Sequence, residues 1–471
     1  MKQPKQRRHH PIRRIVLLLL LVYLAAALVP YALVPMLTRR AGTAPAPELT
    51  ACAGERATIL PTGDEALAVR MNLIANAQRE LVVGTYILAN DDSGHTIASA
   101  LLAAADRGVK VRIVIDGLIG EINLISTDLG RVLNAHENIE LRSYNRVNLL
   151  QPWTLNACFH EKYVIADGQV MVLGGRNLSN EFLTHADHPA YNFDMDIVVW
   201  AEEGTINGPA AAVTSYFDSL WDTCAAQPYP EEPGRKQDSM DALRQALQAR
   251  YDAYCAANPE QLLPVDWAAQ TVPIDGYALL TNPTRPGAST PAVWDGLAGL
   301  MSAAQERLWI MTPYLVLSRQ MKDDLTALSS SPAEVKLLTN SRAGGNNIIA
   351  SADMLLRMKG LLGMGMDLYS FQGPASMHTK ALLIDHDLSV FGSFNFDMRS
   401  AYIDTEMMLA VRSEPLNALL EAHMNDMFAQ SLPLDGSVPA GSTVTPLEID
   451  TKKNLIITLL SPFVSLVHYL L

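Results

Sequence analysis

The chain has 471 residues, of which 36 are basic and 49 acidic, for a formal net charge of −13. Residues 1–40 carry eight of the basic side chains and no acidic one, which leaves 28 basic against 49 acidic residues, or −21, for the rest. An acidic body of this kind is a poor nonspecific binder of nucleic acid, because phosphate contacts need clustered Lys and Arg. A hydrophobic content of 49% with 18% charged residues excludes a largely disordered chain.

The first predicted element is an almost unbroken apolar run at residues 15–37. About 20 apolar residues suffice to cross a bilayer as a helix, so this run predicts a transmembrane anchor. Six Lys and Arg residues precede the run and two follow it, and the positive-inside rule therefore places the basic tail 1–14 in the cytoplasm and the body beyond the membrane. A cleaved signal peptide is the alternative, although Arg39 and Arg40 stand where such a peptide has small residues.

The body consists of two halves with similar patterns. Apolar strands at 81–87 and 308–315 each precede a helical stretch and a further apolar strand. Strands that alternate with helices in both halves predict an α/β layered fold. We place the two domains at 56–226 and 271–431, joined at 227–270 by a linker rich in Pro, Glu and Gly and a connecting helix.

The C-terminal stretch at 454–471 is also apolar. It follows Lys452 and Lys453, contains Pro462, and has a length that is marginal for crossing a bilayer. Two interpretations remain open, a helix that lies in the membrane interface and a helix that packs on the body.

Four cysteines, Cys52, Cys158, Cys224 and Cys255, are too few for a disulfide scaffold. An exported body permits disulfides, and Cys224 and Cys255 are the favoured pair because they flank the linker. The other pairings remain open.

The strongest signal is a duplicated motif. The pattern H-x-K-x4-D occurs as His160, Lys162 and Asp167 and again as His378, Lys380 and Asp385. Each copy runs along an apolar strand, where side chains two positions apart share a face, so the histidine and lysine of each copy point the same way. Asp167 precedes a glycine in a hairpin-turn signal, and Asp385 opens a similar turn.

A return strand follows each copy and leads to a small-residue turn that carries an amide. These amides are Asn177 in Gly-Gly-Arg-Asn and Asn395 in Gly-Ser-Phe-Asn. An antiparallel return brings each turn back beside its histidine, so each half predicts a cluster of one imidazole, one ammonium and one carboxamide. Acidic residues follow in both halves, at Asp194 and Asp196 in the first and at Glu406 in the second.

This combination resembles the phospholipase D superfamily, whose hallmark is the duplicated H-x-K-x4-D with Gly-x-Asn after it. The resemblance covers about residues 56–430, and further stretches are similar to bacterial cardiolipin synthases of the C type, among them the segments at 86–94, 193–196 and 392–407. It implies two tandem α/β/α sandwich domains related by an internal repeat, with the active site at their interface. One departure is Gly117 after Asp116, where a second aspartate is expected.

The resemblance also implies roles for the motif residues. His160 is the expected nucleophile, forming a covalent phosphohistidine, and His378 the acid that protonates the leaving alcohol and then deprotonates the acceptor. Asp196 and Glu406 are expected to accept hydrogen bonds from the imidazoles, with Asp194 as the alternative to Asp196. The groups expected to hold the phosphate oxygens are Lys162, Asn177, Lys380 and Asn395.

Other charged residues have supporting or undecided roles. Asp167 and Asp385 are expected to support their turns. Arg176 and Arg399 bind either lipid phosphate or structural carboxylates. No metal or other cofactor is expected, because two ammonium groups already supply positive charge to the phosphate.

The function that this resemblance implies is phosphatidyl transfer in lipid biosynthesis, with cardiolipin as product. Together with the anchor and its flanking charges, it predicts a catalytic body on the outer side of a bacterial inner membrane. The implied substrates are phosphatidylglycerol and, as a further candidate, phosphatidylethanolamine. Hydrolysis of phospholipid to phosphatidic acid is the first alternative. The second is an exported, membrane-anchored nuclease, which the acidic body disfavours, so we expect no nucleic-acid partner.

Overall fold

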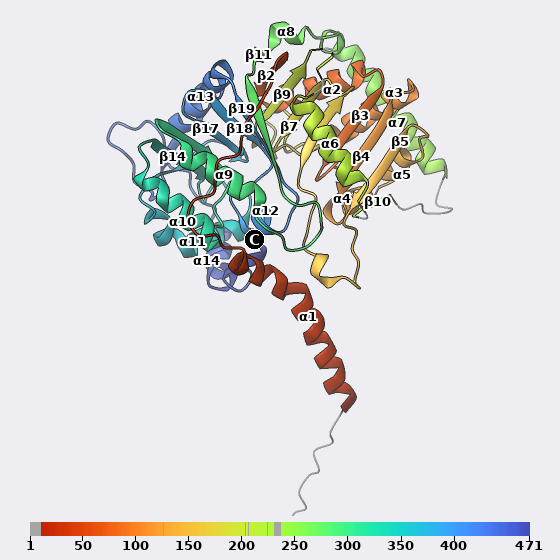
Figure 1. Ribbon diagram of the computed structural model, residues 1–471. Coiled ribbons are helices and arrows are strands. Elements are labelled where there is room, and N and C mark those ends of the chain that lie inside the picture. Colours follow the sequence, from red (N-terminus) through yellow and green to blue (C-terminus); the bar gives the residue numbers. More distant parts are fainter. Residues whose placement is uncertain (1–10, 126, 203, 206, 224, 230–236) are drawn as a thin grey trace, which may run out of the picture.

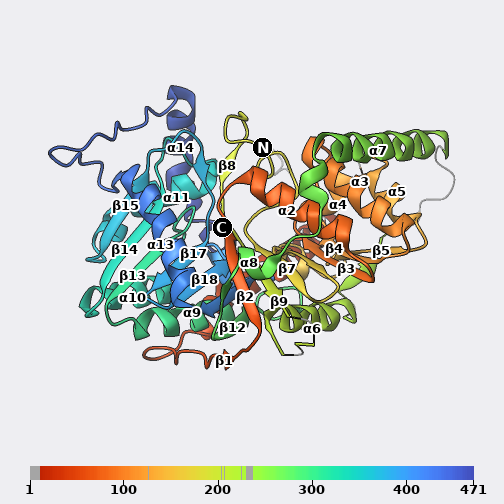
Figure 2. The same ribbon diagram turned by 90° about the horizontal axis from the view of Figure 1, so that it is seen from above.

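The computed structural model describes residues 11–125, 127–202, 204–205, 207–223, 225–229 and 237–471 (Figure 1). Its body contains two nine-stranded mixed sheets, one in each half, which lie side by side when viewed from above (Figure 2). This arrangement confirms the predicted pair of repeated α/β domains.

The two sheets repeat the same strand order. The first is ordered β10 (Ala226–Pro228), β5 (Ile139–Tyr144), β4 (Lys110–Asp116), β3 (Glu80–Thr85), β6 (Lys162–Ala166), β7 (Val170–Gly174), β9 (Asp196–Ala201), β2 (Glu55–Leu60) and β11 (Val272–Pro273). The second is ordered β20 (Ser431–Pro433), β15 (Asp367–Phe371), β14 (Glu334–Asn340), β13 (Arg307–Met311), β17 (Ala381–Ile384), β18 (Leu388–Gly392), β19 (Met407–Arg412), β12 (Gly276–Thr281) and β1 (Thr50–Ala51). In both, three parallel strands lead into an antiparallel set.

Each domain lends an edge strand to the other sheet. β1 precedes the first domain in the chain but pairs with β12 of the second sheet, whereas β11 lies at the start of the second domain and pairs with β2 of the first. A small parallel ladder of β8 (Asn192–Phe193) and β16 (Ser376–Met377) also joins the halves. These exchanges fix the relative position of the two domains.

Helices cover the sheets and connect the halves. The first domain contains α2 (Gly63–Asn76), α3 (Asp92–Asp106), α4 (Ile119–Ile125), α5 (Leu129–Asn134), η1 (Pro152–Thr154) and α6 (Pro209–Trp221). The connecting segment contains α7 (Gln237–Ala257), η2 (Pro259–Leu262) and α8 (Trp267–Gln270), and α7 packs along α3 (Figure 2). The second domain contains α9 (Ala292–Ala303), α10 (Arg319–Ala327), η3 (Leu328–Ser330), α11 (Ile348–Leu362), α12 (Met398–Tyr402) and α13 (Glu414–Ala429).

Alternation along the strands divides the core. On β6, Tyr163 and Ile165 belong to an apolar cluster that the two sheets share, whereas Val164 and Ala166 pack against the helices of the first domain. On β17, Leu383 joins the same shared cluster. Because side chains on a strand alternate between faces, each sheet buries one face in the shared cluster and the other under its own helices.

The N-terminal helix α1 (Pro11–Leu37) extends away from the body (Figure 1). Its residues Ile12–Leu37 are long and apolar enough to cross a membrane, as expected for the predicted anchor. Most of the predicted basic tail 1–14 lies outside the described residues. Beyond α1, the Arg40 guanidinium pairs with Asp295 at 3.0 Å and with Asp324 at 2.7 Å, which fixes the end of the helix to the second domain.

The C-terminal apolar stretch forms α14 (Thr451–Val464) and η4 (His468–Leu470). Ile457, Ser461 and Val464 face α11 and are buried, so one side of α14 packs on the body, while its other side is exposed and apolar.

Among the described cysteines, Cys52, Cys158 and Cys255 are free. Cys224 of the favoured pair lies outside the described residues.

Candidate active site

The two motif histidines lie at the boundary between the domains, and each is held by the opposite half. The His160 N–H donates to the Thr405 carbonyl at 3.2 Å, and the imidazole Nδ1 is 2.8 Å from Glu406 Oε1. The His378 N–H donates to the Phe193 carbonyl at 2.6 Å, and its Nδ1 is 2.7 Å from Asp194 Oδ2. Glu406 directly follows Thr405, whose carbonyl binds His160. Asp194 likewise directly follows Phe193, whose carbonyl binds His378.

The expected contact between Asp196 and an imidazole is wrong, and Asp194 takes that place. Asp196 begins β9 opposite Gly174, where its buried carboxylate pairs with Arg70 at 2.9 Å and Arg176 at 3.2 Å. Register explains the difference: the Phe193 carbonyl accepts from His378, so the next side chain, Asp194, reaches the ring. Arg176 also donates to the Leu60 carbonyl at 2.9 Å. Of the two roles considered for Arg176, the structure therefore shows the bond to a structural carboxylate.

Both motif lysines are buried beside their histidines. Lys162 donates to the His160 carbonyl, and its ammonium lies 5.4 Å from the centre of the Tyr86 ring. The Lys380 ammonium lies 2.7 Å and 3.1 Å from the two ring nitrogens of His378. Burial is the main cause that lowers the pKa of Lys162 to about 7 and that of Lys380 to about 8, and nearby carboxylates oppose it.

The same burial lowers the pKa of both histidines. It is assisted by Lys162 for His160, whose pKa falls well below its ordinary value, and by Lys380 for His378, whose pKa falls to about 4. Both imidazoles are therefore neutral at pH 7. With Nδ1 directed at a carboxylate, each ring presents Nε2 as its remaining nitrogen.

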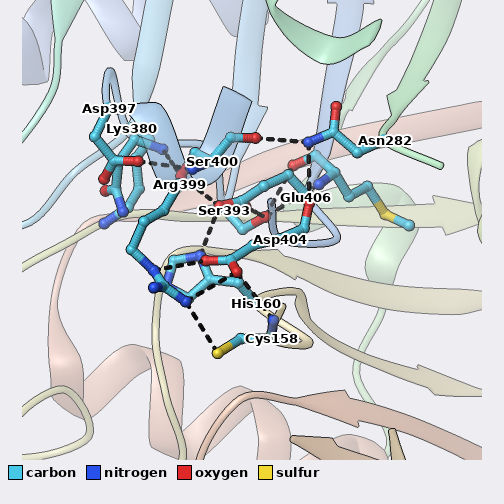
Figure 3. A network of polar contacts seen from close by, with 12 residues as sticks. Cys158, His160, Asn282, Lys380, Ser393, Asp397, Arg399, Ser400, Asp404 and Glu406 are labelled. Atoms are coloured by element: carbon cyan, nitrogen blue, oxygen red, sulfur yellow. Dashed lines mark hydrogen bonds and ion pairs between the residues drawn. The ribbon is translucent and has the colours of Figure 1, made fainter. Parts of the chain in front are cut away.

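The two acid partners differ in charge state. Burial raises the pKa of Glu406 to about 7, against the opposing effects of Lys162 and of the Ser393 and Ser400 hydroxyls, which donate to its carboxylate (Figure 3). Burial also raises the pKa of Asp194, but Lys380 and His378 outweigh it and the net shift is downward. Asp194 is thus the firmly ionised member of the pair.

The two amides of the Gly-x-Asn turns, Asn177 and Asn395, are buried. Asn177 lines the same cavity as His378. In the described structure, the Oδ1 atoms of Asn177 and Asn395 have no hydrogen-bond partner. Because the O and N of an amide exchange by a simple flip, each side chain is available to donate to a phosphate oxygen.

Arg399 belongs to a network behind His160 (Figure 3). Its guanidinium contacts Asp404 at 3.1 Å and donates to the Asn156 carbonyl at 2.7 Å, and Asp404 in turn accepts from the Cys158 N–H at 2.9 Å. Of the two roles considered for Arg399, the structure shows the bond to a structural carboxylate. The network ties the segment before His160 to the second domain.

Asp167 and Asp385 lie in turns away from the imidazoles. Asp167 has a positive φ of 54° and accepts backbone hydrogen bonds from Gln78, Arg79 and Glu80. Asp385 has a φ of 47° and accepts in the same way from residues 305–307. Both therefore support the loop that precedes the strand next to the motif.

A cavity of about 620 Å³ opens beside His378. Its polar lining includes Asn177, Asn340 and Arg342. Its apolar lining comes mainly from α11 and the segment before α14, with Met354, Leu355, Met358, Leu434, Leu447 and Ile449. A site of this composition suits a ligand with a polar head and an apolar body.

Sequence reasoning missed Ser393 and Ser400 as partners of Glu406, and Arg70 as a partner of Asp196. The serines stand within the quoted second-half motif, but nothing in their local pattern says that they reach a carboxylate. Arg70 is distant in the chain from Asp196 and carries no motif at all.

Comparison with known proteins gives a family match and several similar relatives. A family described as "Cardiolipin synthase, PLD-like domain" matches residues 71–221 and 297–428. Cardiolipin synthase C of Escherichia coli (strain K12) is 28% identical over 402 residues, covering 76% of this chain and 81% of that protein. Cardiolipin synthase A of Cronobacter sakazakii is 23% identical over 389 residues, covering 81% and 71%.

A solved structure shares the fold. Phosphatidylserine synthase of Haemophilus influenzae Rd KW20 superimposes with a TM-score of 0.64 at 16% sequence identity, covering 90% of this chain and 97% of that one. The two matched segments of the family contain His160 and His378 respectively, so the repeat seen in the sheets is also the repeat of the family. The chain belongs to the phospholipase D superfamily of phosphatidyltransferases, in the family that carries the cardiolipin synthase PLD-like domain.

Proposed function

We propose that the chain is a membrane-bound cardiolipin synthase that transfers a phosphatidyl group to phosphatidylglycerol through a phosphohistidine. The carrying observation is the pair of histidines, each oriented by a carboxylate of the opposite half, beside a cavity with both polar and apolar lining. Phosphatidylglycerol is the acceptor, and phosphatidylglycerol or phosphatidylethanolamine is the donor.

In the first step, Nε2 of His160 attacks the donor's phosphorus, and the bond from phosphorus to the leaving alcohol breaks. The Glu406 carboxylate supports this attack, because it accepts a hydrogen bond from the Nδ1–H group and stabilises the positive charge that develops on the ring. His378 gives its proton to the leaving alkoxide. The products are phosphatidyl-His160 and the free alcohol.

In the second step, neutral His378 accepts the proton of the acceptor's hydroxyl, whose oxygen attacks phosphorus and displaces His160. For the first step His378 must be protonated, although burial and Lys380 lower its pKa to about 4. A phosphate anion bound beside the ring opposes the effect of Lys380 and raises the pKa. Asp194, ionised at neutral pH, stabilises the resulting imidazolium.

The nonbridging phosphate oxygens are held by Lys162, Lys380 and the amides of Asn177 and Asn395. The lysine ammonium groups are buried, so their attraction for an anion is little weakened by water. With each amide flipped so that its N–H groups face the phosphate, Asn177 and Asn395 donate neutral hydrogen bonds to the same oxygens. The apolar side chains of the cavity suit the adjoining acyl chains.

α1 supports the membrane-bound part of the proposal. We place its N-terminal end in the cytoplasm of a bacterial cell and the catalytic body at the outer face of the inner membrane, because basic residues concentrate before the apolar run. Modification of single introduced cysteines by a membrane-impermeant thiol reagent in intact and opened cells tests this orientation.

The reaction is tested with purified full-length protein and labelled phosphatidylglycerol, with and without phosphatidylethanolamine. Labelled cardiolipin is the expected product, and phosphatidic acid without cardiolipin overturns transfer in favour of hydrolysis. His160→Ala and His378→Ala are each expected to abolish turnover. Mapping of an acid-labile phosphorylated peptide in the protein trapped during turnover tests the nucleophile, and an adduct on His378 overturns the assignment of His160.

A further inference from the structure

We propose that the body docks on the bilayer through a two-part apolar surface that flanks α1. One part is the loop at 147–153 of the first domain, and the other is the outward face of α14 in the second. The inference rests on the proposed anchoring of α1, and its occupant is the interfacial region of the phospholipid leaflet next to the body.

The length of α1 that is free of the body requires such contact. The apolar part of α1 that is fully exposed runs over residues 15–22, after which the helix begins to pack, with Ala27 and Tyr31 buried. At 1.5 Å per residue this free part measures about 12 Å, against a hydrocarbon core of about 30 Å. A helix that spans the bilayer must therefore draw its packed portion, and the elements beside it, towards the membrane.

The loop of the first domain lies against that packed portion. The Tyr31 hydroxyl donates to the Trp153 carbonyl, and η1 contacts α1 directly. The loop nevertheless exposes a series of apolar side chains: Leu150 is 87% exposed, and Val147, Leu149 and Trp153 are exposed as well. In Figure 1 this loop lies beside α1, at the end of the body from which the helix emerges.

α14 provides the second part from the opposite domain. While Ile457 and Val464 face the body, the other side of the helix exposes Leu455, Leu459, Phe463 and, just beyond its end, Leu466, which is 73% exposed. This i, i+4, i+8, i+11 spacing forms one apolar stripe. Lys452, exposed at the start of the helix, adds a cation suited to lipid phosphates.

The two parts are joined around α1. η4, which follows α14, contacts α1, and Val34 of α1 packs against the same core cluster as Tyr469 and Leu470. The loop and the C-terminal segment thus both adjoin the part of α1 nearest the body. Since a helix that spans the bilayer carries lipid around it, the leaflet itself is the occupant that reaches both faces.

Docking through these two parts also brings the cavity beside His378 close to the lipid leaflet. Leu447 and Ile449 line the cavity, and α14 begins immediately after them at Thr451. A lipid in the leaflet under α14 therefore lies next to one wall of the cavity that holds His378. A lipid substrate then has a short route from the leaflet to this cavity, along which its acyl chains stay in an apolar environment.

The test uses the full-length protein in phosphatidylcholine vesicles whose acyl chains are brominated, because bromine quenches tryptophan that enters the bilayer. Leu150→Trp and Phe463→Trp report on the two parts. Leu263→Trp is the matched control, since Leu263 is also exposed but lies just before α8, at the end of the molecule opposite α1 (Figure 1). Each variant is measured against the parent protein, which contributes six tryptophans.

The added emission of both reporters is expected to be about twofold lower in brominated than in plain vesicles, because interfacial elements reach 5–10 Å into the leaflet. The emission added at Leu263→Trp is expected to be unchanged. Equal quenching of a reporter and the control, or quenching of only one reporter, overturns the two-part surface. Retention in vesicles after an alkaline wash reports anchoring separately, and release by that wash overturns both the anchor and the docking surface.

Discussion

The Nδ1 of His378 lies 2.7 Å from Asp194 Oδ2 across a sequence separation of 184 residues, so the second domain's histidine is oriented by the first domain's carboxylate. The converse pair, His160 and Glu406, is separated by 246 residues. Each motif histidine is therefore oriented by a carboxylate of the opposite domain. Catalysis requires the two domains to hold their relative position, which the exchanged edge strands β1 and β11 secure.

Asp194→Asn and Asp196→Asn are expected to fail in different ways. An amide at Asp194 no longer stabilises the imidazolium of His378, so turnover of phosphatidylglycerol falls about 10²-fold or more while the fold is kept. An amide at Asp196 leaves the buried guanidinium groups of Arg70 and Arg176 without their carboxylate, which destabilises the protein by about 3–5 kcal/mol. Turnover and thermal unfolding of both variants decide the matter. Loss of turnover in Asp196→Asn at an unchanged melting temperature would show that Asp196 has the catalytic role after all.

The buried lysines set an alkaline limit on substrate capture. In the proposed mechanism Lys162 and Lys380 hold the phosphate as ammonium groups, and burial lowers their pKa to about 7 and about 8. The value of kcat/KM, which reports the free enzyme, is expected to fall about tenfold per pH unit between pH 7 and 8, where Lys162 loses its proton, and about a hundredfold per unit above pH 8, where Lys380 loses its proton as well. Phosphatidylglycerol is a diester that does not itself titrate in this range, so the fall in kcat/KM reports groups of the protein.

Stability is expected to change in the opposite direction over the same range. Because the folded protein lowers both lysine pKa values from 10.5, it binds fewer protons than the unfolded chain, and the contribution of these groups to stability increases as the pH rises from about 7 to 10.5. Thermal melts at each pH therefore separate loss of capture from unfolding. A kcat/KM that stays level up to pH 10 contradicts the role of the lysines.

The strands, and the positions of the two motif histidines next to them, can be predicted from the sequence because both follow from local patterns. His160 and Lys162 stand at the start of an apolar strand with a turn residue at its end, and such a pattern can be recognised without knowledge of the partner strand. The repeat then predicts the second copy around His378. The same locality explains why Asp167 and Asp385 were correctly placed in turns.

The choice between Asp194 and Asp196 could not be made in this way, since the contact crosses between domains. Matching Asp194-Met-Asp196 to Asp404-Thr-Glu406 favours Asp196, whereas β9 and β19 align Asp194-Met195 with Glu406-Met407. That alignment places Gly174 and Gly392 opposite equivalent positions. The exchange of β1 and β11 was equally inaccessible, because two-residue edge strands carry no periodic pattern.

The turn aspartates are expected to matter for stability and not for chemistry. Asp167→Ala removes the acceptor of three backbone N–H groups and places alanine at a φ of 54°, so the free energy of unfolding is expected to fall by about 1–3 kcal/mol. Asp167→Asn keeps an acceptor and tolerates the left-handed conformation, so its loss is smaller. Denaturant melts measure both, with turnover at 25 °C as the control. A loss of turnover in the folded Asn variant contradicts the turn role.

The hydroxyls of Ser393 and Ser400 are expected to tune the carboxylate that orients His160. Both donate to Glu406 and hold down its pKa, which burial has already raised to about 7. Removing either donor raises that pKa further, so less of the carboxylate is ionised at pH 7 and the acidic limb of kcat/KM moves to higher pH. Ser389→Ala is the matched control, because Ser389 is a buried serine of β18 whose hydroxyl has no partner in the described structure. An acidic limb that moves equally in all three variants, or in none, would mean that the serines do not act through Glu406, since only two of the three hydroxyls reach that carboxylate.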